Sequence, residues 1–221
     1  QRIMAAIAEN LQVVRARLDR VPGVTLLAVS KAQPLERIQE AVAAGQKAFG
    51  ENYVQEAVQK MEGLPGLEWH LIGPLQSNKT RLAAERFDWV QTVASEKIAR
   101  RLSEQRPAGL APLNVLIQVN VSAEQTKSGV ALPEAAALAS AISALPRLKL
   151  RGLMAIPEPG AERARYRSVK KLFDELGMPK TKRTKTGYTT DADALQSLYV
   201  QTGHPFLAAM LLHRDASRLK V

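Results

Sequence analysis

A lysine at the end of an apolar run is the residue of this sequence best placed to do chemistry. Lys31 follows the run Leu26–Val29 and Ser30, and Pro34 comes three residues later. A lysine amine becomes a nucleophile only when burial or nearby positive charge lets it lose its proton. In the alternative interpretation, the aliphatic stem of Lys31 packs at the end of a strand and its ammonium group reaches solvent. Position alone favours this alternative.

Other reactive or metal-binding groups are scarce. The sequence contains no cysteine, which excludes disulfides, thiolate metal sites and cysteine nucleophiles. Its three histidines, His70, His204 and His213, are far apart and lack the spacing of a metal-binding motif. We therefore expect no metal site.

Short apolar runs alternate with amphipathic stretches along most of the chain. The apolar runs predict strands at residues 25–30, 47–50, 68–72, 89–93, 114–121 and 149–156. The amphipathic stretches predict helices at residues 2–18, 35–44, 54–61, 77–85, 96–105 and 133–145, and a further helix that ends near residue 177. Strands separated by helices indicate a parallel sheet, and six consecutive units favour an α/β fold of the (β/α) barrel type over a doubly wound sheet. In such barrels, chemistry takes place at the carboxyl ends of the strands.

This alternation stops after residue 177. The stretch PKTKRTKTGYTT has four basic residues and no acidic ones, and predicts a solvated loop. Helices are predicted at residues 190–200, capped by Thr190 or Asp191, and at residues 205–219, with no seventh or eighth strand. We therefore expect an incomplete barrel over residues 1–165 and a helical C-terminal extension over residues 166–221. The open edges of the first and sixth strands need a cover, which either the extension or a homodimer would provide.

Five segments within residues 1–165 carry a family resemblance. AVSKAQP, FGENYVQE, WHLIGPLQSNK, QVNVSAEQTKSGV and RGLMAIPEP, in this order, closely resemble the pyridoxal phosphate homeostasis protein family, the single-domain relatives of the alanine racemase barrel. The resemblance implies an alanine-racemase-like barrel that holds pyridoxal 5′-phosphate as a Schiff base on Lys31. It also implies a carrier or regulator of the cofactor, with no catalytic residues and no turnover.

The same resemblance implies the rest of a cofactor site. Asn52 and the Gly73–Asn78 turn would surround the cofactor, with Met154 nearby, and the other candidate ligands are His70, Gln76, Asn78 and Lys127. Each of these has a structural alternative. A lone asparagine at a strand end is more often a loop cap, His70 could be a hydrogen-bonded core histidine, and Lys127 could be a surface lysine.

One part of the family pattern is missing. The resemblance implies that the cofactor phosphate is held near the last two strands, by segments similar to S-x-G-M-S-x-D and V-R-I-G-x-x-I-F-G. Neither segment occurs in this sequence. Because charge-assisted hydrogen bonds to a phosphate contribute roughly 1.5–3 kcal/mol each, we expect weakened retention of the cofactor.

The last quarter of the chain carries most of its charge. Residues 163–221 hold 12 basic and 5 acidic residues, a net charge of +7 out of +10 for the whole chain. Residues 170–221, with the core TKTGYTTDADALQSL, resemble a thumb and palm segment of the bacterial DNA polymerase I family, so the chain looks chimeric. The alternative function is duplex nucleic-acid binding through the basic residues Lys180, Lys182, Arg183, Lys185 and Arg214.

Two further interpretations limit that alternative. The palm carboxylates of a polymerase are absent, which excludes polymerase activity, and a basic run of this kind is more often a solvated loop. A chimera without any evolved function is the third hypothesis.

No apolar run reaches the ~18–20 residues of a membrane span, so we expect a cytoplasmic protein that does not bind membranes.

Overall fold

The computed structural model describes residues 2–18, 25–121, 128–156, 163–177, 186–189, 195–202 and 208–211. Its strands are β1 (Leu26–Val29), β2 (Ala48–Glu51), β3 (Glu68–Leu71), β4 (Trp89–Val93), β5 (Leu113–Asn120), β6 (Val130–Ala131), β7 (Leu148–Ala155), β8 (Thr186–Thr189), β9 (Leu195–Thr202) and β10 (Ala208–Leu211). Its helices are α1 (Arg2–Leu18), α2 (Leu35–Ala43), α3 (Val54–Gly63), α4 (Thr80–Arg86), α5 (Glu96–Gln105), α6 (Ala135–Ser143) and α7 (Arg163–Glu175), with 3₁₀ turns η1 (Ser77–Lys79) and η2 (Leu132–Glu134).

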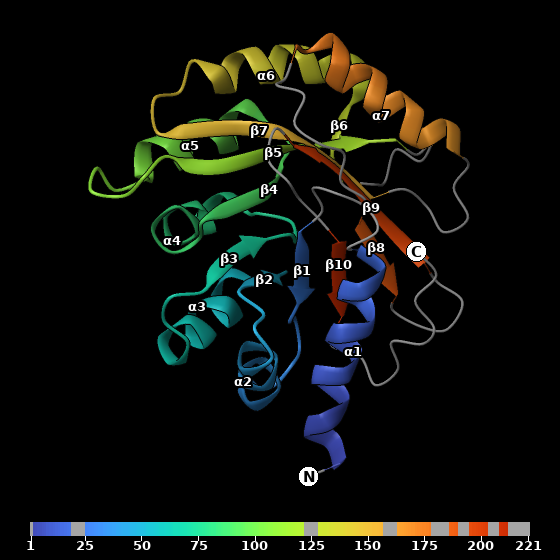
Figure 1. Cartoon of the computed structure of the whole chain (residues 1–221). Helices are drawn as coiled ribbons and strands as arrows, with labels where there is room; N and C mark the ends of the chain where they lie inside the picture. The colour runs from blue at the N-terminus through green and yellow to red at the C-terminus, as the bar shows by residue number, and fades with distance from the viewer. Residues whose placement is uncertain are drawn as a thin grey trace.

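The strands form a curved sheet with helices on its outer side (Figure 1). Their order is β10-β1-β2-β3-β4-β5-β7-β9-β8, and the short strand β6 pairs with β5. Strands β1 to β5 and β7 are parallel to their neighbours in that series. Residues of β8 approach β10, so the two ends of the order meet. The α/β barrel predicted from the sequence is confirmed.

Local signals explain where the helices begin and end. Ser95 caps α5, because its hydroxyl oxygen accepts a hydrogen bond from the backbone N–H of Ile98 at 3.3 Å. Helix α2 begins after Pro34 and is followed by Gly45, which has a φ of 84°. Each of the six predicted strands, and each predicted helix up to residue 145, lies within three residues of its predicted bounds. The largest difference is at α4, which begins at Thr80 because the 3₁₀ turn η1 occupies residues 77–79.

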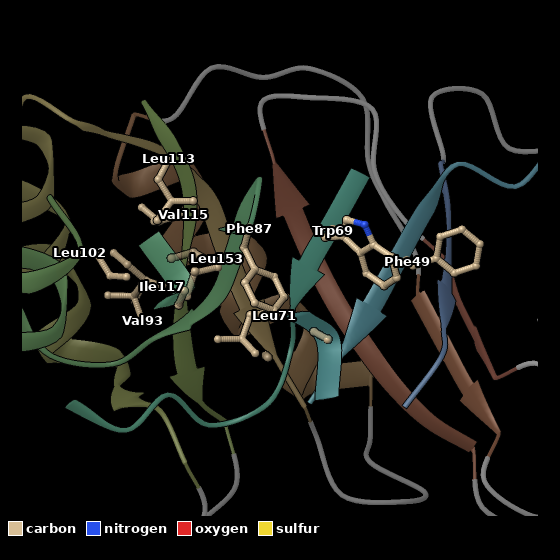
Figure 2. Close-up of a cluster of buried hydrophobic side chains, with 14 of the residues drawn as sticks. Phe49, Trp69, Leu71, Phe87, Val93, Leu102, Leu113, Val115, Ile117 and Leu153 are labelled. Carbon is tan, nitrogen blue, oxygen red and sulfur yellow. The ribbon is translucent and has the colours of Figure 1, made fainter. Parts of the chain in front are cut away.

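Apolar side chains pack in two layers, one on each face of the strands. The outer layer lies between strands and helices; Figure 2 shows Leu102 of α5 beside Val93 and Ile117 of the sheet. The inner layer fills the barrel with Leu27, Val29, Ala48, Ile72, Trp89, Leu116 and Met154. Alternate residues of a strand point to opposite faces, so a single strand supplies both layers.

The C-terminal part of the chain corrects the sequence-based prediction. Strand β9 lies where a helix was predicted at residues 190–200, and β10 lies within the helix predicted at residues 205–219. Strand β8 falls in the stretch predicted as a loop. The prediction of no further strand was therefore wrong, as was the prediction of a helical extension. Residues 178–185, 190–194, 203–207 and 212–221 lie outside the described part of the chain.

Tertiary pairing explains these strands. Strand β10 runs parallel to β1, with Leu26 opposite Ala208, and β9 runs antiparallel to β7, with Gly152 opposite Thr202. Open strand edges carry unpaired N–H and C=O groups, and pairing them outweighs a weak local preference for helix. Of the two covers expected for the open barrel, the C-terminal extension is the one that this structure uses; a homodimer stays a prediction.

Candidate functional site

Lys31 lies in a tight turn at the carboxyl end of β1 and is half-buried. The turn is held by two backbone hydrogen bonds: the Ser30 N–H donates to the Gly50 carbonyl at 3.0 Å, and the Gln33 N–H donates to the Ser30 carbonyl at 3.0 Å. Ala32, the next residue, has a φ of 56°, in the left-handed region that few non-glycine residues adopt. Lys31 therefore extends from a fixed backbone at the carboxyl-terminal face of the barrel.

Asn52 and Gly73 lie side by side at the same end of the barrel. Asn52 follows β2 and is half-buried, and Gly73 follows β3 and is buried. A Cβ atom placed on Gly73 would lie 2.2 Å from the Asn52 carbonyl oxygen, so only glycine allows this close approach. The Thr92 hydroxyl donates to the Gly73 carbonyl at 2.8 Å, which connects the end of β4 to the same point.

The remaining predicted site residues divide into three groups. Gln76 and Asn78 lie in the exposed turn after β3, on the rim of this face. Met154 of β7 is fully buried in the inner apolar layer, together with Val29 and Ile72. Lys127 lies outside the described residues. The structure thus brings the ends of β1, β2 and β3 together, with Met154 in the apolar layer beneath them.

His70 occupies a different environment, inside the barrel. Its ring is fully buried and stacks on Trp89, with centroids 5.3 Å apart and planes 11° from parallel. Nε2 hydrogen bonds to the Glu68 carboxylate at 2.8 Å, and Nδ1 to the Gln91 side chain at 2.9 Å. Both ring nitrogens therefore have protein partners, which favours the interpretation of His70 as a core histidine. Burial lowers the pKa of His70, against the hydrogen bond and charge of Glu68.

Sequence reasoning missed a buried ion cluster directly beside Lys31. Lys60 of α3 donates through Nζ to the Glu51 carboxylate at 2.8 Å and to the Glu56 carboxylate at 2.6 Å. The Ser30 hydroxyl also donates to Glu51, at 2.6 Å. The spacing of Glu56 and Lys60 on a predicted helix was a signal for an ion pair. Nothing in the sequence indicated that this pair turns inward, toward the strand ends.

Glu51 is the most buried member of this cluster. Desolvation raises the pKa of its carboxyl group, against the lowering effect of the hydrogen bonds from Lys60 and Ser30 and of the Lys60 charge. Its second oxygen, Oε2, is buried and has no hydrogen-bond partner among the described residues. The Glu51 carboxylate is thus stabilised in the interior by hydrogen bonds to Oε1 alone, from Lys60 and Ser30.

The site offers amine chemistry without metal ligands. Within the described ranges, no group of three or more His, Asp or Glu side chains could hold a metal ion. None of the helices that the structure describes is long and apolar enough to cross a membrane. A lysine at the end of β1, an asparagine at the end of β2 and an inner apolar layer in one barrel are groups that a flat, aldehyde-bearing aromatic ligand requires.

Comparisons with known proteins show which family the chain resembles. The family profile described as "Alanine racemase, N-terminal domain" matches residues 4–180. The pyridoxal phosphate homeostasis protein of Escherichia coli K12 is 55% identical over 168 residues, which cover 73% of this chain and 72% of that protein. The protein of the same name from Pseudomonas aeruginosa PAO1 is 58% identical over 171 residues, covering 73% and 74% of the two chains.

A solved structure extends the similarity to the fold. PipY of Synechococcus elongatus PCC7942, solved without pyridoxal phosphate, is 33% identical with a TM-score of 0.75, covering 92% of this chain and 97% of PipY. The structure of PipY with pyridoxal phosphate bound has a TM-score of 0.73 at 32% identity. The barrel described above is thus shared with a protein that binds this cofactor.

We expect Gly73→Ala to destabilise the protein, because the added methyl group would force the loops after β2 and β3 apart. Overpacking of this kind costs at least about 1–3 kcal/mol. Urea unfolding would measure the loss, with Gly109→Ala as the matched control, since a Cβ at Gly109 meets no atom within 4 Å. Equal midpoints for the two variants would contradict the close approach.

The environment of His70 predicts a pH dependence of stability. Because burial lowers the pKa of His70 in the folded state, the unfolded chain takes up a proton first as the pH falls through about 6.5. Stability due to the neutral ring is therefore complete above that pH and lost below it, by at most about 1.4 kcal/mol per pH unit.

Urea unfolding between pH 7.5 and 5.5 would test this expectation by comparing the parent chain with His70→Asn. Other titrating groups are present in both proteins and cancel in the comparison. A steeper loss of unfolding free energy in the parent is expected; parallel pH profiles would contradict the prediction.

Proposed function

The chain belongs to the pyridoxal phosphate homeostasis protein family, which has the alanine racemase N-terminal fold, and we propose that it binds pyridoxal 5′-phosphate through Lys31 without turning over a substrate. The observation that carries the proposal is the position of Lys31, which is half-buried in a fixed turn at the carboxyl face. Half-burial is compatible with both interpretations of Lys31, and membership of the family is what supports the reactive amine. The name of the Escherichia coli relative and the cofactor-bound PipY structure point the same way.

The described residues fit the cofactor chemically. Pyridoxal phosphate has a flat aromatic ring with an aldehyde, which requires a primary amine, an apolar surface and a few polar anchors. Lys31 would supply the amine, and Asn52 would supply an amide side chain at the same end of the barrel. Val29, Ile72 and Met154 supply the apolar layer below the strand ends. The proposed holding residues are therefore Lys31 and Asn52, with Gln76 and Asn78 at the rim.

The role of each residue follows from its place. When bound, the cofactor supplies an electrophilic carbon that a lysine amine can capture reversibly. Lys31 would fix the cofactor at one atom, and Asn52 would orient its ring by hydrogen bonding. Gly73 would keep the Asn52 loop in position, since its backbone packs against Asn52. His70 has no direct role in this proposal, because both of its ring nitrogens are engaged within the barrel.

The proposed site lacks the segments that would bind the phosphate group of the cofactor. Residues 178–221 contain neither of the two segments that the family resemblance implies for phosphate binding. We infer that the covalent bond at Lys31 and the ring contacts account for most of the affinity. Retention would then be weaker than in relatives that keep those segments.

The nucleic-acid alternative receives no support from the relatives described above, none of which is a polymerase. Its residues, Lys180, Lys182, Arg183, Lys185 and Arg214, lie outside the described part of the chain. The resemblance to a polymerase segment, the chimeric origin and a cytoplasmic location therefore stay predictions from the sequence.

Lys31→Ala should abolish the absorbance band of lysine-bound cofactor that appears when pyridoxal phosphate is added to the purified protein. The control is Lys47→Ala, which removes an exposed lysine next to β2 and should leave the band unchanged. Borohydride reduction followed by mass spectrometry should place the cofactor on the peptide that contains Lys31. Absence of the band in the parent protein, or its survival in Lys31→Ala, would overturn the proposal.

The missing phosphate segments predict that pyridoxal binds this chain within about tenfold of the affinity of pyridoxal 5′-phosphate. In a relative that keeps both segments the difference should be larger, because each charge-assisted hydrogen bond corresponds to roughly tenfold to a hundredfold in affinity. Spectroscopic titration of both proteins with both compounds measures the two ratios. A thousandfold preference for the phosphorylated form in this chain would show that another element holds the phosphate.

A further inference from the structure

Lys60 and its partners form a cluster that is hydrogen-bonded to the turn that contains Lys31. We propose that Lys60 is a positioning residue, which holds Lys31 in its binding orientation by anchoring the backbone on both sides of it. The inference rests on the proposed function of Lys31 and adds a residue to its machinery. Lys60 lies 29 positions along the chain on a different element, helix α3.

The first anchor is direct. Lys60 Nζ donates a hydrogen bond to the carbonyl oxygen of Ser30, the residue before Lys31, at 2.8 Å. Its other two partners are the carboxylates of Glu51, at 2.8 Å, and Glu56, at 2.6 Å. An ammonium group has three N–H donors, so all three are used. Lys60 therefore acts as a fixed point of the site and does not compete with Lys31 for an aldehyde.

The second anchor passes through Glu56. The carboxylate oxygen that accepts from Lys60 also accepts from the backbone N–H of Ala32, the residue after Lys31, at 2.7 Å. Hydrogen bonds to a charged acceptor are stronger than neutral ones. The two peptide groups that flank Lys31 are thus connected to one ammonium group.

The conformation of Ala32 shows why an anchor is needed. A φ of 56° places this alanine in the left-handed region, where a side chain is disfavoured. Such a conformation persists only when its surroundings hold it. The Glu56 carboxylate stabilises this conformation by accepting a hydrogen bond from the Ala32 N–H.

Burial makes the anchor rigid. The side chain of Lys60 is 10% exposed and that of Glu51 is fully buried, and the Ser30 hydroxyl also donates to Glu51 at 2.6 Å. Removal of one charge of a buried pair is strongly destabilising, because it leaves the other charge unpaired in the interior. The end of β1, the end of β2 and helix α3 are therefore fixed relative to one another.

The test compares variants at the least buried member of the cluster. Glu56 has a side chain 30% exposed, so its substitution leaves the buried Lys60–Glu51 pair intact. Glu56→Ala removes the acceptor for Ala32, whereas Glu56→Gln keeps a carbonyl oxygen that accepts from both Ala32 and Lys60. Glu62→Ala, an exposed position on the same helix, is the matched control. Lys60→Met is the second variant.

Two properties are measured on the purified full chain. The first is hydrogen exchange of the Ala32 amide without added cofactor, and the second is the affinity for pyridoxal 5′-phosphate together with the fraction attached to Lys31 after borohydride reduction. In Glu56→Ala, exchange should be faster and affinity weaker by roughly tenfold or more, the factor expected for one charge-assisted hydrogen bond. Glu56→Gln and Glu62→Ala should stay within about threefold of the parent, a difference worth under 1 kcal/mol.

The outcomes separate this inference from the proposed function. A parent protein that fails to bind the cofactor overturns the proposed function, and Ala32 exchange then decides whether Glu56 and Lys60 hold the turn. A parent that binds, with Glu56→Ala and Lys60→Met equal to it in affinity and in the fraction on Lys31, overturns the positioning role. Weaker binding in Glu56→Ala that Glu56→Gln restores supports it.

Discussion

Pairing of strand edges is the constraint on which the rest of this structure depends. Each backbone N–H and C=O of a strand needs a partner, and a parallel sheet with two open edges leaves two rows of them unpaired. Here β10 covers β1 and β9 covers β7. The ring that results carries the carboxyl ends of β1 to β5 to one face of the barrel. The close approach of Asn52 and Gly73, and the position of Lys31 at the same end of the barrel, follow from that arrangement.

A buried ion pair is the second feature that organises the site, and local hydrogen bonds offset the free-energy cost of burying its charges. Glu51 and Lys60 lie in the interior, where an unpaired charge would be strongly destabilising. Each is retained by hydrogen bonds to the other and to Ser30. A buried ion pair adds little net stability, but it fixes direction, because its partners must keep their geometry. That property suits a site in which one lysine must point toward a ligand.

Family membership and local structure explain different aspects of the protein. The match to pyridoxal phosphate homeostasis proteins shows the family and the fold. The arrangement of Lys60, Glu56 and Ala32 gives a physical reason for the fixed backbone on either side of Lys31 in this chain. The hydrogen bonds of His70 serve a different purpose, since the bond to Gln91 connects β3 to β4 in the interior and the bond to Glu68 engages the other ring nitrogen.

The sequence by itself determined the six strands and the helices between them, because periodicity and local signals such as Ser95 and Gly45 act over a few residues. It also placed Lys31, Asn52 and Gly73 at strand ends. Tertiary structure alone decided that residues 195–202 and 208–211 are strands, because they pair with sheet edges that are distant in sequence although their own spacing predicted helices. It likewise decided that Lys60 turns inward and that His70 has no free ring nitrogen. Those outcomes depend on which elements meet in space, and a local pattern carries no information about that.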